Sequence, residues 1–83
     1  MNEYLEKVLI YLKQELPDNY KDGIEIADSS FVVSVPNGTS FSTGYEELFK
    51  CINASIGRVR VREFDFEFIV KSENQQREFK ILK

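Results

Sequence analysis

One segment, residues 58–70, constrains the fold more than any other part of this chain, because its alternation of apolar and charged residues changes phase. Its valines occupy odd positions, whereas its phenylalanines occupy even ones. Successive side chains of a strand point to opposite faces, so an unbroken strand would separate these two apolar sets. One extra residue at Arg62 and Glu63, a β-bulge, restores a single apolar face. That face would comprise Val59, Val61, Phe64, Phe66, Phe68 and Val70. We therefore predict one bulged strand over residues 58–70.

The length and charge of the chain limit its class. Its 83 residues suit one domain, which we place at residues 1–83, and 42% of them are hydrophobic, as in folded globular proteins. A net charge of −3 opposes generic attraction to nucleic acid or to an anionic membrane. No apolar run approaches the ~20 residues of a membrane span, and the N-terminus lacks the pattern of a secretory signal. With Cys51 as the single cysteine, no intrachain disulfide can form, and we expect a cytoplasmic protein.

The N-terminal half predicts a helix followed by a hairpin. Apolar residues recur every three or four positions in residues 2–16, and Pro17 ends this amphipathic helix. Ile10 lies outside the apolar stripe, on the side expected to face water. Two short alternating segments follow, at residues 24–26 and 31–35. Pairing Ile26 with Phe31 and Ile24 with Val33 buries one common face, so we predict an antiparallel hairpin.

The middle of the chain predicts a turn, a short strand and a second helix. Asn37 and Gly38 are residue types that tight turns need, so residues 39–42 are expected to form a third short strand. Thr43 and Glu46 fit a capping box at the start of a helix, and Gly57 fits its C-terminal cap. The apolar stripe of this helix is Tyr45, Leu48, Phe49, Ile52 and Ile56.

A return strand completes the predicted sheet. Phe79 and Ile81 lie where an antiparallel strand would face Phe68 and Phe66, and Glu67 would then face Lys80. The expected fold class is α+β: an antiparallel sheet of four or five strands with two helices on one face. Its element order would be α-β-β-(β)-α-β-β, an open-faced sandwich.

Residues 2–56 resemble a double-stranded RNA-binding domain in their predicted layout. The resemblance is carried by the order helix, three short strands, helix, with the segment 31–38 in its middle. Such domains grip phosphates with a basic start of the second helix. Here residues 43–47 are Thr-Gly-Tyr-Glu-Glu, which is acidic and would repel phosphate. The resemblance therefore implies topology, and no RNA-binding residue is carried over.

The residue inventory argues against catalysis. The chain has no histidine, which removes Ser-His-Asp and Cys-His arrangements and the commonest transition-metal ligand. Cys51 has no obvious activator and is expected to be a partly buried apolar side chain. Residues 18–23 resemble a calcium loop in part, but Tyr20 and Ser29 stand where ligands are needed. No motif for a nucleotide appears. We expect no enzyme activity, no cofactor and no metal.

The open face of the predicted sheet is the candidate site. The residues assigned to partner binding are Arg58, Arg60, Arg62, Glu63, Asp65, Glu67, Ile69, Lys80 and Leu82. Arginines beside carboxylates and isolated aliphatics are typical of a surface that contacts another protein. We therefore expect a small non-catalytic binding or adaptor protein, with self-association left open and nucleic acid disfavoured. One alternative is an accessory protein of phage or mobile-element type, which inhibits a nucleic-acid enzyme by presenting carboxylates in place of phosphates. The other is a domain like those that bind double-stranded RNA, which the resemblance above implies.

Overall fold

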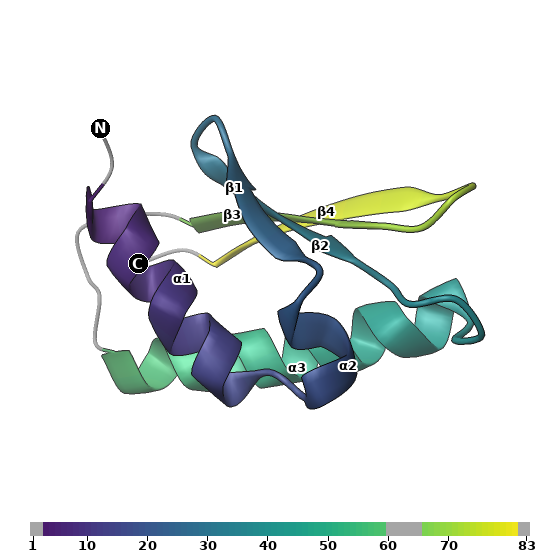
Figure 1. Cartoon of the computed structure of the whole chain (residues 1–83), viewed down its shortest axis with the longest axis horizontal. Helices are drawn as coiled ribbons and strands as arrows, with labels where there is room; N and C mark the ends of the chain where they lie inside the picture. The colour runs from purple at the N-terminus through teal and green to yellow at the C-terminus, as the bar shows by residue number, and fades with distance from the viewer. Residues whose placement is uncertain (1–2, 60–65, 82–83) are drawn as a thin grey trace.

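The computed structural model describes residues 3–59 and 66–81. Within them the chain forms an α+β fold with three helices and a four-stranded sheet (Figure 1). The elements are α1 (Glu3–Glu15), α2 (Asp18–Lys21), β1 (Ile24–Ala27), β2 (Ser30–Ser34), α3 (Phe41–Val59), β3 (Phe66–Lys71) and β4 (Gln76–Ile81). The expected α+β class is confirmed, and α2 is a short helix that the sequence pattern did not predict.

The sheet is mixed, with the strand order β1-β2-β3-β4. The two outer pairs, β1 with β2 and β3 with β4, are antiparallel hairpins, as expected. The central pair, β2 with β3, is parallel. A parallel pair needs a crossover connection long enough to return the chain to the same end of the sheet, and α3 supplies it. The expectation of an all-antiparallel sheet was therefore wrong at its centre.

The registers of both hairpins agree with the sequence pattern. Ile24 pairs with Val33 and Ile26 with Phe31 in the first hairpin. In the second, Phe68 pairs with Phe79, Phe66 with Ile81, and Glu67 with Lys80. Asp28, at φ 58°, opens the turn of the first hairpin, where a tight turn requires a positive φ. Both predicted registers are confirmed because each buries one apolar face.

The connection between β2 and α3 differs from the prediction. No strand forms at residues 39–42, because α3 already begins at Phe41. The hydroxyl of Ser40, not Thr43, accepts a helix-start hydrogen bond, from the backbone N–H of Thr43 at 3.3 Å. Gly38 has φ 93° in the turn before it. With two strands rather than three before the second long helix, the layout of a double-stranded RNA-binding domain is not reproduced.

The first two residues of the predicted bulged strand are helical, because α3 extends to Val59. Arg58 and Val59 belong to the last turn of α3, and Gly57 lies inside the helix rather than at its cap. Val59 follows Ile56 by three residues, a spacing that fits the apolar stripe of a helix. Residues 58–59 are therefore compatible with either a helix or a strand. The strand is confirmed for Phe66–Lys71, while the proposed bulge at residues 62–63 lies outside the described residues.

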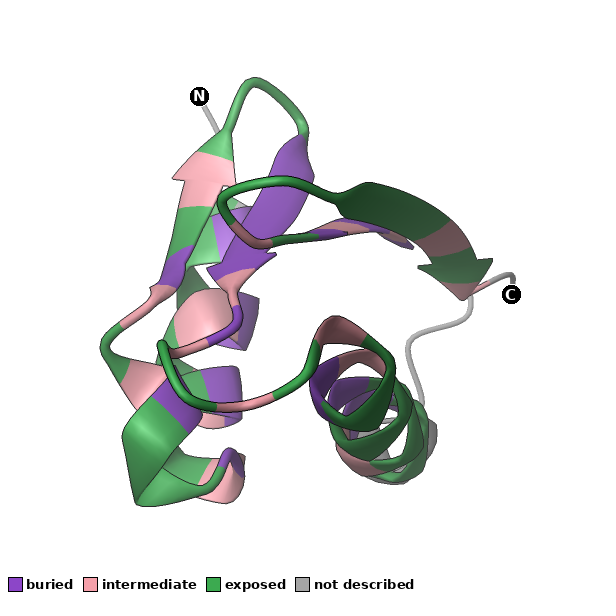
Figure 2. Ribbon diagram, turned by 90° about the vertical axis from the view of Figure 1, so that its right-hand side faces the viewer, coloured by how far each residue is buried: buried purple, intermediate pink, exposed green. Residues whose placement is uncertain are grey.

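The molecule has two layers, with the sheet packed on α1 and α3 (Figure 2). One face of the sheet and the apolar stripes of both long helices form the core. Its fully covered side chains include Leu12, Leu48, Ile52, Phe31, Phe68 and Val70. Gly44 lets α3 approach Val35, the residue directly after β2, because a Cβ at Gly44 would lie 2.7 Å from Cγ1 of Val35. The helices thus cover one face of the sheet, which leaves the other as the candidate site.

Candidate functional site

The open face carries two rows of side chains that cross all four strands. One row is Glu25, Val32, Ile69 and Glu78, which pair in register from β1 to β4. Neighbouring strands are about 4.8 Å apart, so two aliphatic side chains lie between carboxylates at the two edges. Val32 is 8% exposed, Ile69 is half-buried, and both glutamates are exposed. The row therefore presents Ile69 as a small apolar centre, beside the buried Val32, with acidic ends.

The second row is Ala27, Ser30, Glu67 and Lys80. The hydroxyl of Ser30 donates a 2.7 Å hydrogen bond to Oε1 of Glu67 across the parallel strands. This bond fixes the position of one carboxylate beside Ile69. Lys71 and Lys80 add exposed positive charge to the same face, so the face carries both signs.

The predicted site residues fall into three groups. Glu67, Ile69 and Lys80 lie together on the open face, as the alternation predicted. Arg58 lies in the last turn of α3 instead of on the sheet, so its assignment to this face was wrong. The other five lie outside the described residues: Arg60, Arg62, Glu63, Asp65 and Leu82. The described part of the site is thus smaller and less basic than expected.

The structure also forms an aromatic groove that the sequence analysis missed. It has a volume of about 590 Å³ and is lined by Phe41, Ser42, Tyr45, Glu46, Phe49, Gln75, Gln76 and Arg77. Three aromatic residues recur at four-residue spacing along α3, and their rings stack in sequence. Phe79 meets Phe49 edge-on, with ring centroids 5.0 Å apart. The four-residue spacing was the available signal, because such residues share one side of a helix.

Arg77 places a cation at this groove. Its guanidinium carbon lies 4.7 Å from the ring centroid of Tyr45, within the range of a cation–π interaction. Arg77 belongs to β4 and points to the helical side of the sheet, since it pairs with the buried Val70. Phe49 is 37% exposed, so the groove keeps apolar surface in contact with solvent.

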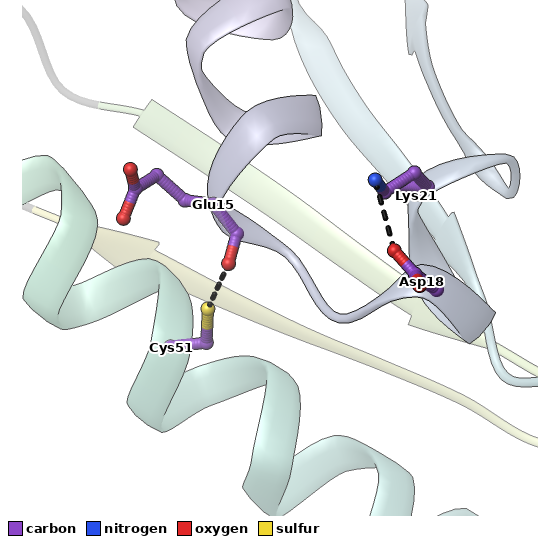
Figure 3. Close-up of polar contacts among 4 residues, drawn as sticks. All are labelled: Glu15, Asp18, Lys21 and Cys51. Atoms are coloured by element: carbon purple, nitrogen blue, oxygen red, sulfur yellow. Dashed lines mark hydrogen bonds and ion pairs between the residues drawn. The ribbon is translucent and has the colours of Figure 1, made fainter.

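The thiol of Cys51 is engaged in a structural contact (Figure 3). Its Sγ donates a hydrogen bond to the backbone oxygen of Glu15, with 3.4 Å between the two atoms. Glu15 ends α1, where carbonyl groups lack partners within the helix. Cys51 is half-buried and packs against the core, as expected for a small apolar side chain. The contact therefore joins α3 to the end of α1.

The residues that partly resemble a calcium loop form the helix α2 instead. Lys21 and Asp18 make an exposed ion pair at 3.0 Å across one turn of this helix (Figure 3). Tyr20 is buried and donates a 2.7 Å hydrogen bond to Oε1 of Glu47. Burial, then this hydrogen bond and the negative charge of Glu47, raise the pKa of Tyr20 to about 12. Across residues 3–59 and 66–81, no three potential metal ligands cluster.

Comparisons with known proteins give no family for this chain. No protein-family model, curated protein or solved structure gave a significant match. In the part of the chain that the structure describes, no helix combines the length and apolar character of a membrane-spanning segment. Arguments about function therefore rest on the residues and their geometry.

Proposed function

We propose that this chain is a small non-catalytic protein-binding module whose open sheet face contacts the partner. The row Glu25, Val32, Ile69, Glu78 carries the proposal, because it places an apolar centre between two exposed carboxylates on a face that no described helix covers. Protein interfaces commonly combine an apolar centre with a polar rim. A sheet also holds such a row in fixed geometry.

The row implies a partner of particular chemistry. Its two carboxylates are separated by three strand spacings, about 14 Å. A complementary surface would therefore place an aliphatic or aromatic side chain over Ile69, with lysine or arginine on either side. The fixed carboxylate of Glu67 beside Ile69 adds a third acceptor for such basic groups.

The two-signed charge favours protein contact over the phosphate-mimic alternative. A phosphate mimic needs carboxylates in a continuous row, without cations between them. On the described open face, Lys80 lies opposite Glu67 and two residues from Glu78, and Lys71 adds a second exposed cation. Such alternation suits a protein surface that also carries both signs.

A matched pair of lysine substitutions tests the proposal. Ile69→Lys places a charge in the apolar centre, whereas Ile10→Lys changes the same residue type on α1, where Ile10 is 61% exposed. We expect wild type and Ile10→Lys to retain the same protein from nuclease-treated lysate, and Ile69→Lys to lose it. Circular dichroism of each variant checks that it is folded. Equal retention by folded Ile69→Lys would contradict the proposed surface.

A further inference from the structure

We infer that the outer edge of β4 is a self-association surface, on which a second copy of this chain adds its own β4 in antiparallel orientation. β4 is the last strand of the sheet, and no described segment pairs with its outer edge. Unpaired strand edges are templates for pairing with another chain. This inference concerns the backbone edge of the sheet and does not rest on the proposed function, although Glu78 and Lys80 beside that edge also belong to the open face.

The hairpin geometry identifies the backbone groups that are free to pair. The N–H of Ser72 donates to the carbonyl of Gln75 at 2.8 Å, so these residues form a hydrogen-bonded pair at the turn. Hydrogen-bonded and non-hydrogen-bonded pairs alternate along an antiparallel ladder. Arg77, Phe79 and Ile81 thus direct their backbone groups to β3. The groups of Gln76, Glu78 and Lys80 point to the outer edge.

Charge selects one register for two copies related by a two-fold axis. Pairing Glu78 with Glu78, or Lys80 with Lys80, places like charges directly opposite each other, which is unfavourable. Pairing Glu78 with Lys80 of the second copy places opposite charges together, and symmetry makes this contact twice. Both residues have outward backbone groups, so this register also satisfies the hydrogen-bonding pattern. The axis then passes between the two copies of Phe79.

The same register fits the helical side of the sheet. The two Phe79 side chains would form a non-hydrogen-bonded pair, in which cross-strand side chains approach most closely. Ile81 of the second copy would lie beside Arg77, at the end of β4 that borders the aromatic groove. Ile81, Phe79 and Phe49 all retain exposed surface in the single chain. Pairing of the two strands would therefore cover apolar surface on both copies and join their sheets into eight strands.

Charge reversal tests this register directly by sedimentation equilibrium of the full chain. We expect the wild type to form a dimer, and Glu78→Lys or Lys80→Glu alone to weaken it roughly tenfold, because two pairs become like-charged. An equimolar mixture of the two variants restores opposite charges in both pairs, so it should associate as a heterodimer. Glu25→Lys, the matched reversal on the other edge strand, should leave the dimer unchanged.

Several results would overturn the inference. These are a wild type that stays monomeric up to about 1 mM, a dimer that tolerates Glu78→Lys, or a mixture that fails to associate. A monomeric chain whose β4 instead pairs with a segment of another protein would also overturn it. Lys80→Glu places two glutamates opposite each other within the chain, at Glu67, so urea unfolding of each variant checks the fold first. Binding through the open face is measured separately with Ile69→Lys, so either proposal can fail alone.

Discussion

The ring of Phe68 stacks on the ring of Phe79, with centroids 5.2 Å apart and planes 11° apart. On its other side, Phe68 stacks on Phe31 at 5.1 Å. Three neighbouring strands are thus connected by one layer of aromatic rings on the helical side of the sheet. Phe68 is completely buried at the centre of this layer.

Phe68→Ala should therefore destabilise the fold severely. Removal of a buried phenylalanine typically costs about 3–5 kcal/mol, a large share of the ~5–15 kcal/mol stability of a small domain. Phe49→Ala is the matched control, because Phe49 is 37% exposed and should cost at most about 1–2 kcal/mol. Urea denaturation measures both. Similar losses for the two variants would show that the aromatic layer is not the centre of the core.

Gly44→Ala should also destabilise the protein, although alanine is the better helix former. Alanine gains about 1 kcal/mol of helix propensity, but its Cβ would lie 2.7 Å from Cγ1 of Val35. Valine is restricted at χ1 and cannot easily move aside, so overpacking of about 1–3 kcal/mol should prevail. A double-mutant cycle checks this: in a Val35→Ala background, Gly44→Ala should become neutral or stabilising. Stabilisation by Gly44→Ala alone would mean that α3 and Val35 are farther apart.

Tyr20 should make stability depend on pH in alkaline solution. The pKa of its phenol is about 12 in the folded chain, against 10.0 as the ordinary value. The folded state therefore holds this proton more tightly, so the stabilising contribution is complete below pH 10 and is lost as pH rises towards 12. Tyr20→Phe should cost about 1 kcal/mol near neutral pH, by loss of the hydrogen bond to Glu47. Relative to this variant, wild-type stability should fall above pH 10; parallel pH profiles would refute the assignment.

The registers of the two hairpins were predictable from the sequence, because alternating apolar residues all lie on one face of a strand and that face must be buried. Ile26 opposite Phe31 and Phe68 opposite Phe79 follow from that rule and a short connection. The parallel pairing of β2 with β3 was not predictable in the same way, since it depends on how α3 crosses the sheet. Alternating strands that have one open face bury the same residues whether the neighbouring strand runs parallel or antiparallel, so the alternation did not reveal the direction of β3 relative to β2.

Helix ends were the second weak point. Ser40 and Thr43 are both residue types that cap helices, so residue type alone does not choose between them, and the helix uses Ser40. Valine and arginine alternate at residues 58–61, so Val59 fits a strand as well as the helical spacing from Ile56. The assignment of Arg58 to the sheet face failed for this reason, whereas Glu67, Ile69 and Lys80 were placed correctly.

Site-specific photo-crosslinking tests the proposed protein-binding face most directly. A photoreactive phenylalanine derivative in place of Ile69 crosslinks to whatever lies over the centre of the row Glu25, Val32, Ile69 and Glu78. The same group in place of Ile10 tests for a partner on α1. We predict that position 69 forms a discrete crosslink to a partner protein, that added unmodified chain competes with it, and that position 10 forms none. Equal crosslinking at both positions, or none at position 69 while the partner is still retained, would contradict binding through the open face.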